Sequence, residues 1–274
     1  MPFEEIVVVS NAPEEFGERE DRRLAVELEK YAPSRFQLLK GLSPENMSPT
    51  SAYLFRCIYD ESIGNVVKDM APIYEYLHQN KVPYLTVYNG KGDQRGKSYL
   101  AKLYKEGFQV VPTFLTATEA LGFDAKEYLV KPFVGGTGIG VQTFSREELA
   151  DASIGKAFVI QPRIKIAYET SYLYIDNAFQ YALKTGESRW DLVVYEPSAD
   201  ELAFGEKCIA WNPIKGIQRV DCAWTTGGKQ YLLELEDWCP FLSLFDSADT
   251  PKDAFIENLV KSLKNFDYKE LQIV

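Results

Sequence analysis

Two glutamates, Glu234 and Glu236, occupy alternate positions in an otherwise apolar segment, residues 230–236. In an extended strand alternate side chains point to the same face, so these carboxylates are expected to lie side by side. Carboxylate oxygens held close together in apolar surroundings are suited to a hard divalent cation. This pair is therefore the first candidate for chemistry in the chain.

The preceding segment, residues 218–224, is expected to pair with this strand, because Gly227 and Gly228 lie in the short connection between them. It carries Arg219 and Asp221, which are also two apart and share a face. If the charged faces of the two strands coincide, three carboxylates meet, and like charges repel unless a cation lies between them. We favour two Mg²⁺ ions, which would in turn bind nucleotide phosphates. The alternative is a half-exposed sheet with charges facing solvent, and the apolar neighbours argue against it.

A second candidate is a glycine-rich loop between two expected strands, within residues 128–141. Glycines leave backbone N–H groups uncovered, so such a loop can approach an anion closely. Lys131 ends the first strand and would add a positive charge beside that anion. A glycine-rich hairpin turn is the alternative. The glycines of this loop are Gly135, Gly136, Gly138 and Gly140, with the second strand beginning near Ile139.

Residues 89–98 resemble a P-loop, because Gly96-Lys97-Ser98 follows an expected strand and precedes an expected helix at residues 99–106. A P-loop has four residues between its two glycines. Counting back from Gly96, the first glycine should therefore stand at position 91, which holds Lys91. No strand ending in aspartate follows at a useful distance. The P-loop interpretation is therefore disfavoured, but Lys97 at a helix start remains a candidate phosphate ligand.

Composition narrows the possible functions. The 274-residue chain carries a formal net charge of −10, so broad binding to nucleic acid is disfavoured. No apolar run reaches the length of a membrane span and no signal peptide is recognisable. The four cysteines lack CxxC spacing, which indicates free thiols in a reducing cytoplasm. His78 is the only histidine, so carboxylates must hold any metal, which favours Mg²⁺ or Mn²⁺.

Short apolar runs alternate with helical patterns over the first hundred residues, which is typical of an open α/β sheet. A helix is expected at residues 65–79. Ligands of such sheets gather at the carboxyl ends of the strands, where Arg56 lies. Substrate contact and a solvated loop are both open for Arg56. Strands are expected at residues 5–10, 36–39, 53–57 and 83–88.

The rest of the chain divides into two further parts. Residues 110–161 predict a small α+β unit, with a helix at residues 146–150 capped by Ser145. Pro162 and Arg163 would form the hinge out of this unit. Beyond residue 168 the pattern becomes antiparallel, and a helix is expected at residues 251–265.

Taken in order, these features resemble the ATP-grasp superfamily. Within it the chain is similar to glutathione synthetase and the ribosomal-protein glutamate ligases, and most similar to the cycloserine-ligase-like group. The resemblance implies an α/β (α+β) ATP-grasp fold. It divides the chain into an N-terminal open α/β sheet domain (residues 1–97), a central α+β lobe with the glycine-rich lid (residues 98–163) and a C-terminal antiparallel-sheet lobe (residues 164–274). The features are Lys97, Lys131 with its glycine loop, Gln161 at a strand end, Asp221, and the pair Glu234 and Glu236.

The resemblance also implies nucleotide contacts. Lys97 and Lys131 would contact the ATP phosphates or the adenine edge, and Glu169 the ribose hydroxyls. Backbone groups of Gln161, Arg163 and Ile164 would meet the adenine, although Gln161-Pro162-Arg163 replaces the more usual glutamate-containing segment. The lid over the β- and γ-phosphates would comprise Gly135, Gly136, Thr137, Gly138 and Gly140.

Asp221, Glu234 and Glu236 would hold two Mg²⁺, or Mn²⁺ in their place, with Glu236 standing where many members have asparagine. Lys184 and Arg219 would neutralise the transferring phosphoryl group, and Arg56 would contact substrate.

The implied reaction joins a small carboxylate to an amine through an acyl phosphate, releasing ADP and phosphate. It could be intramolecular. An ATP-grasp phosphotransferase and a nucleotide-binding module without catalysis remain alternatives. The partners would be small molecules rather than nucleic acid or membrane, and the oligomeric state is open, with a homodimer one possibility.

Overall fold

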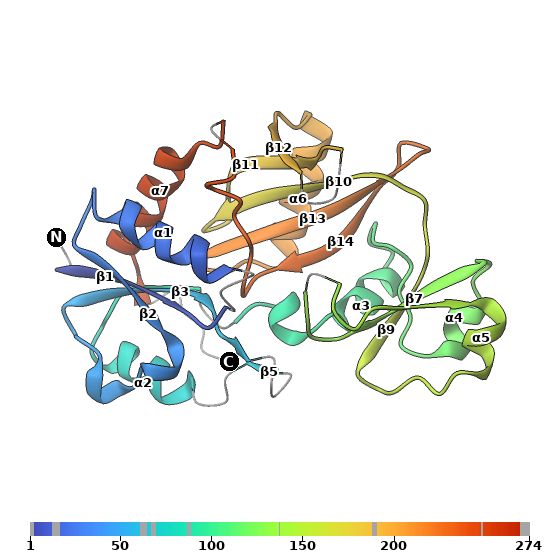
Figure 1. Ribbon diagram of the computed structural model, residues 1–274, viewed down its shortest axis with the longest axis horizontal. Helices are drawn as coiled ribbons and strands as arrows, with labels where there is room; N and C mark the ends of the chain where they lie inside the picture. Colours follow the sequence, from blue (N-terminus) through green and yellow to red (C-terminus); the bar gives the residue numbers. More distant parts are fainter. Residues whose placement is uncertain are drawn as a thin grey trace.

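The computed structural model describes residues 3–12, 17–60, 65–66, 70–86, 89–136, 138–187, 191–247 and 249–268. Figure 1 shows the N-terminal sheet and a small lobe at opposite ends of the molecule, with a larger sheet between them. Among the described residues, no helix combines the length and the apolar character needed to cross a membrane.

The N-terminal sheet is parallel, as the sequence predicted, with strand order β2-β1-β3-β6. Helix α1 (Arg19–Leu28) packs on one face and helix α2 (Met70–Gln79) on the other. The helix expected over residues 65–79 is described only from Met70, because Asn65–Val66 form a short strand, β5, paired with β4 (Tyr59–Asp60). The strands are β1 (Glu5–Ser10), β2 (Ser34–Leu38), β3 (Ser51–Cys57) and β6 (Tyr84–Leu85), with 3₁₀ turns η2 (Leu39–Gly41) and η3 (Pro44–Asn46).

The small lobe is a three-stranded antiparallel sheet with order β8-β7-β9. Ser145 caps the lobe's second helix through a reciprocal capping box with Glu148, so the predicted cap is confirmed. The strand expected near Ile139 begins three residues later, after the glycines. The elements are β7 (Glu127–Pro132), β8 (Gln142–Ser145), β9 (Phe158–Pro162), α4 (Ala117–Leu121) and α5 (Arg146–Asp151).

The larger sheet is antiparallel, with order β12-β11-β10-β13-β14. One face packs against α3 and α6, and the other shares a core with α1, α7 and the N-terminal sheet. Strand β12 was not predicted, because it is a four-residue edge strand. The elements are α3 (Tyr99–Lys105), β10 (Ile166–Ile175), β11 (Ala178–Thr185), β12 (Leu192–Tyr195), α6 (Ala199–Trp211), β13 (Ile217–Thr225), β14 (Gln230–Glu236) and α7 (Lys252–Lys264).

Two segments connect the small lobe to the larger sheet. The first runs from Val110, which pairs with Leu232 at the edge of β14, to Phe114, which pairs with Ile160 of β9. The second, residues 163–165, leads from β9 into β10. The Gln161 side chain donates a 2.9 Å hydrogen bond to the Thr113 hydroxyl, so the two connections are tied together.

Gly216, just before β13, lies against the backbone of Thr86, which follows β6. Its φ is +130°, and a Cβ there would lie 2.5 Å from the Thr86 nitrogen. This close approach joins the larger sheet to the edge of the N-terminal sheet. A side chain at this position would force the two sheets apart.

We expect Gly216→Ala to lower the free energy of unfolding by about 2–4 kcal/mol, through backbone strain plus overpacking. Gly228→Ala is the matched control: its φ is +74°, but a Cβ there meets nothing within 4 Å. Strain alone should cost about 1 kcal/mol at that turn. Urea denaturation would measure both, and equal losses would contradict the close packing at Gly216.

Candidate active site

Strands β13 and β14 place their charged residues opposite one another. Arg219 pairs with Glu236, and Asp221 pairs with Glu234. The register shifts only after Asp221, so the bulge leaves these two pairs aligned. The charged faces of the hairpin therefore coincide, as the alternating pattern predicted.

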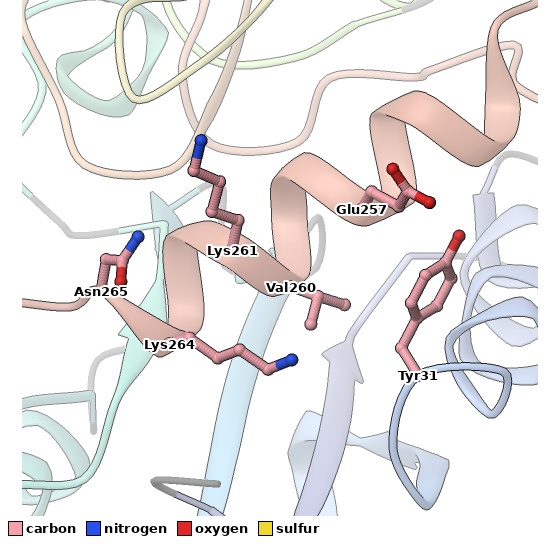
Figure 2. Close-up of a pocket in the computed structure, with 6 residues that line it drawn as sticks. All are labelled: Tyr31, Glu257, Val260, Lys261, Lys264 and Asn265. Atoms are coloured by element: carbon pink, nitrogen blue, oxygen red, sulfur yellow. The ribbon is translucent and has the colours of Figure 1, made fainter.

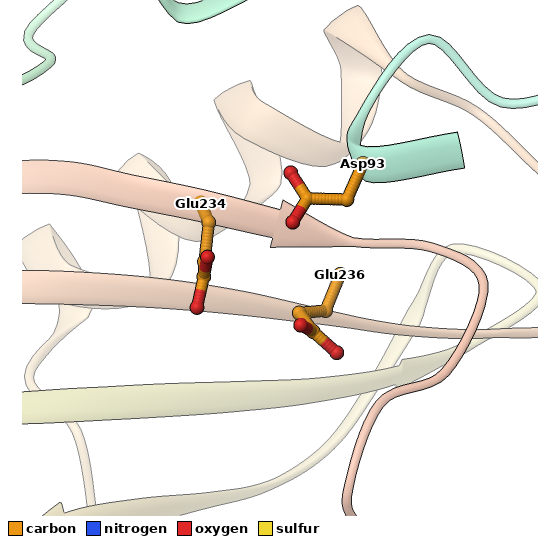
Figure 3. Close-up of side chains that lie close together, drawn as sticks. All are labelled: Asp93, Glu234 and Glu236. Atoms are coloured by element: carbon orange, nitrogen blue, oxygen red, sulfur yellow. The ribbon is translucent and has the colours of Figure 1, made fainter. Parts of the chain in front are cut away.

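A third carboxylate joins Glu234 and Glu236, and it comes from outside the sheet. Asp93 begins a 3₁₀ turn, η4 (Asp93–Arg95), in the loop before α3. One oxygen from each of Asp93, Glu234 and Glu236 lies within 4.8 Å of the others. Figure 3 shows the Asp93 side chain beside the two glutamates of β14. Three clustered carboxylates from three positions fit a hard cation such as Mg²⁺ or Mn²⁺.

The Lys97 ammonium lies between two of these carboxylates. It donates to Asp93 and, at 2.5 Å, to Oε2 of Glu234. The Tyr99 hydroxyl donates to the other oxygen of Asp93 at 3.0 Å, and it accepts a 2.6 Å hydrogen bond from the Leu235 backbone. Lysine, aspartate and tyrosine thus form one network around β14.

Burial and charge set the protonation of this group. Burial raises the pKa of Asp93 to about 7, although Lys97 opposes the shift. Burial also raises the pKa of Glu236 well above its usual value, against the opposing charge of Arg219. Burial disfavours ionised Glu234 too, but the Lys97 ammonium outweighs it and lowers that pKa to about 2. Glu234 is therefore the carboxylate held ionised before any metal arrives.

Asp221, the third predicted metal ligand, is held by Arg219. The guanidinium donates to both carboxylate oxygens, at 2.8 and 2.7 Å, and the Ser171 hydroxyl donates to one of them at 2.7 Å. Arg219 also donates to the carbonyl of Phe241 at 2.8 Å. Asp221 shares the face of the glutamates but lies outside the group formed with Asp93.

The glycine-rich loop begins next to this group. Lys131 of β7 is half-buried, and its charge helps to lower the pKa of Glu234. The backbone N–H of Lys97 donates to the Phe133 carbonyl at 2.8 Å, which ties the start of α3 to the base of the loop. Thr137 lies outside the described residues. Positive φ values, which favour glycine, occur at Gly135, Gly138 and Gly140, while Gly136 is exposed.

The near-P-loop, residues 89–98, binds a carboxylate of its own chain. The backbone N–H groups of Gly92 and Gln94 donate to the two oxygens of Asp237, at 3.0 and 2.7 Å. Asp237 is fully buried and also accepts from the Asn212 side chain at 2.9 Å. A Cβ on Gly92 would lie 2.6 Å from the Leu235 carbonyl, which explains the glycine. These amides hold the loop, and with it Asp93, against the end of β14.

The predicted adenine and ribose contacts lie around the second connection. Gln161 is buried, Arg163 is exposed and ion-paired with Glu127 at 3.1 Å, and Ile164 is half-buried. Glu169 of β10 pairs with Ala223, on the face that also carries Asp221. Their roles stay predictions.

Two predicted residues are not brought to the carboxylate group. Lys184 pairs with Thr170, whose neighbour Ser171 pairs with Asp221, so Lys184 points to the opposite face of the sheet. Its ammonium lies 3.8 Å from the centre of the Tyr168 ring.

Arg56 is buried in a different network. It donates to Asp21 at 2.9 Å and to the Pro240 carbonyl at 2.6 Å, and it lies 3.4 Å from Glu20. Glu20 in turn accepts from the backbone of Leu242. Arg56 thus fastens α1 to the segment that follows β14.

Asp93 was missed because it lies in a loop with no strand pattern. Its spacing of four residues from Lys97 would suggest an ion pair on a helix, but Gly96 between them has a φ of +77° and the two residues do not share a helical turn, so this spacing is not a reliable signal. The contact with Glu234, more than a hundred residues away, has no signal in the sequence.

The molecule also has a pocket of about 380 Å³ between α7 and the turn after α1 (Figure 2). No described residue of the carboxylate group contributes to it. It is lined by Tyr31, Glu257, Val260, Lys261, Lys264 and Asn265.

No model of a known protein family matches the sequence, and no curated protein matches it. Several solved structures, in contrast, match the fold of this chain. A D-cycloserine synthetase, DcsG, is 19% identical, with a TM-score of 0.66 over 94% of this chain and 99% of that one. An ATP-grasp ligase from Chryseobacterium gregarium, associated with ribosomally made peptides and solved with ADP and a leader and core peptide, is 12% identical, with a TM-score of 0.65 over 99% and 100%. D-alanine–D-alanine ligase from Bacillus anthracis is 16% identical, with a TM-score of 0.60 over 95% and 97%. At these identities the likeness shows the fold.

The raised pKa values predict how metal affinity depends on pH. A metal must displace the protons held by Asp93 and Glu236, so Mn²⁺ should bind more tightly as pH rises through about 7. For one group with this pKa, affinity should increase about tenfold between pH 6 and pH 8. Electron paramagnetic resonance of free Mn²⁺ would measure it without nucleotide. Asp237, whose pKa burial raises to about 6, also titrates near this range, but it lies outside the carboxylate group and is held by backbone amides. A pH-independent affinity would refute the assignment.

Proposed function

The chain has the ATP-grasp fold, and from that fold and the carboxylates of β14 we propose that it is an ATP-dependent carbon–nitrogen ligase. It joins a carboxylate to an amine, forming an amide or peptide-type bond, and releases ADP and phosphate. The substrate carboxylate attacks the γ-phosphorus, which gives an acyl phosphate and ADP. The amine then displaces phosphate.

The observation that carries this proposal is the carboxylate group at the end of β14, with basic residues beside it. Asp93, Glu234 and Glu236 offer clustered oxygens. Lys97 and Arg219 contact the same patch. Phosphoryl transfer requires mainly positioning and compensation of charge, and this site supplies both without a histidine. A catalytic chain with one histidine is consistent with such chemistry.

The residues of the carboxylate patch and its surroundings have different tasks in this reaction. Glu234 and Glu236, with Asp93 beside them, would hold Mg²⁺, which would supply charge that stabilises the phosphoryl oxygens. Lys97 and Lys131 bind the phosphates, and Arg219 stabilises the charge that develops in transfer. Asp221 orients Arg219 through its paired hydrogen bonds. The glycine-rich loop covers the phosphates and keeps water from the acyl phosphate. Lys184 has no task here, because it points to the other face.

The substrates belong to two classes. By their names, the neighbours described above join D-alanine units or make D-cycloserine, and one carries a bound peptide, which supports small molecules or peptide groups as the carboxylate and the amine. An acidic chain with net charge −10 is consistent with substrates other than nucleic acid.

The test is a screen for ADP release over amino acids, small carboxylates and peptides, followed by trapping with hydroxylamine. We expect an acid that elicits ADP release to yield a hydroxamate, because hydroxylamine intercepts the acyl phosphate. Glu234→Gln should lower the rate at least about a hundredfold, because it removes a metal ligand. Glu257→Gln, an exposed change on α7, should leave the rate unchanged. A stable phosphorylated product without hydroxamate would instead identify a phosphotransferase.

A further inference from the structure

Lys97 is anchored by Asp93, a member of the carboxylate group that has no task toward the nucleotide in the proposed reaction. Its ammonium donates to Asp93 and to Glu234. The Asp93 side chain is 4% exposed and the Glu234 side chain 25% exposed, so the two partners differ in how far solvent reaches them. Asp93 is the more deeply buried partner, and Glu234 is the one that solvent reaches.

We propose that Asp93 is a positioning residue that presents the Lys97 ammonium to the nucleotide phosphates. The inference rests on the proposed function, because it requires a nucleotide at this site. It deepens that function by assigning a role to a carboxylate in the loop before α3. Asp93 acts through Lys97 rather than by touching substrate.

The anchor itself is fixed from a second side. Tyr99, six residues along the chain, donates its hydroxyl hydrogen to Asp93 at 3.0 Å. The same hydroxyl accepts from the backbone N–H of Leu235, between the two glutamates of β14. The position of Asp93 is therefore set by the strand that carries the metal ligands. Any nucleotide bound at that strand finds Lys97 at a fixed distance.

Lys97 is also fixed at its backbone. Its N–H donates to the Phe133 carbonyl, at the base of the glycine-rich loop. With its backbone tied to the loop and its ammonium tied to Asp93, the long side chain has few conformations left. A lysine side chain loses rotamer entropy when it is immobilised. Because Asp93 already immobilises the Lys97 side chain in the folded protein, this entropy is not lost again when a nucleotide binds.

Asp93 shares the role of anchor with Glu234 when no cation is bound, and it would be the remaining anchor if Glu234 held a cation. A divalent cation held by Glu234 would take one of the two partners of Lys97 and would repel its ammonium. The bond to Asp93 remains, so the ammonium stays in the site and can turn to a phosphate oxygen. Without Asp93, Lys97 would either compete for Glu234 or swing into solvent.

Two effects of Asp93 on nucleotide affinity have opposite signs. By charge alone, a carboxylate near phosphates weakens anion binding, so removing it should tighten binding. By positioning Lys97, the same carboxylate strengthens binding, so removing it should weaken binding. A metal-free measurement separates these effects from any direct role of Asp93 as a metal ligand.

The experiment measures ADP binding to the full chain by calorimetry in the presence of EDTA. We expect Asp93→Asn to weaken ADP binding about tenfold, which is the size of a coupling between contacting residues. In the Lys97→Met background the same change should have no effect or tighten binding, because no ammonium remains to be positioned. Asp246→Asn, an exposed aspartate, serves as the charge-matched control and should leave affinity unchanged.

Tyr99→Phe provides a second route in case Asp93→Asn folds poorly. It keeps both charges and removes the hydroxyl that orients Asp93, so it should weaken ADP binding in the same direction by a smaller factor. Unchanged or tighter ADP binding in both variants would overturn the role of Asp93. Weaker binding that persists undiminished without Lys97 would also overturn it. If the unmodified chain bound no ADP even with Mg²⁺, the proposed function itself would fall.

Discussion

Compensation of charge at the β13–β14 hairpin is the constraint on which the rest of the site depends. Four carboxylates, Asp93, Asp221, Glu234 and Glu236, lie on or beside one face of two strands. Two cations oppose them, each bound to particular carboxylates: Arg219 to Asp221, and Lys97 to Asp93 and Glu234. Because burial raises the pKa values of Asp93 and Glu236, the patch becomes net negative, and so suited to divalent cations, as these two carboxyls lose their protons. Without a metal, the side chains of Lys97 and Arg219 offset the repulsion between the closest carboxylates, so the chain can fold before a divalent cation binds.

Local patterns predicted much of this arrangement. Alternation in β14 was enough to place Glu234 and Glu236 on one face, and the glycines of the turn were enough to pair β13 with it. The parallel N-terminal sheet followed from continuous apolar runs such as β1. The cap at Ser145 followed from a serine three residues before a glutamate. In each case the signal lies within a few residues of the structure that it predicts, so one sequence suffices.

What could not be predicted depends on contacts between distant segments. Asp93 lies beside Glu234 because Asp237 binds the backbone of the loop that carries Asp93. Neither segment contains a sequence pattern that predicts its contact with the other. The same loop looked like a phosphate cradle because its glycines and amides are suited to an anion, and the anion proves to be an internal carboxylate. The role predicted for Lys184 came from the resemblance alone, which does not give the register between β10 and β11. That register directs the Lys184 side chain to the face opposite the carboxylates. Arg56 was correctly placed near a strand end, but its partners come from α1 and from the segment after β14.

The paired connections between the small lobe and the larger sheet restrict how the lobe can move. A lobe joined by one flexible segment could swing in any direction. Here there are two connections, of which the first pairs with β14 at one end and β9 at the other, and the bond from Gln161 of β9 to Thr113 ties it to the strand that leads into the second. The motion that strains these contacts least is a rotation about the line through the two crossings. Val110 lies on that line and pairs directly with β14, so the axis runs beside the strand that carries the glutamates. The glycine-rich loop would then sweep an arc over those carboxylates, while the carboxylates themselves stay still.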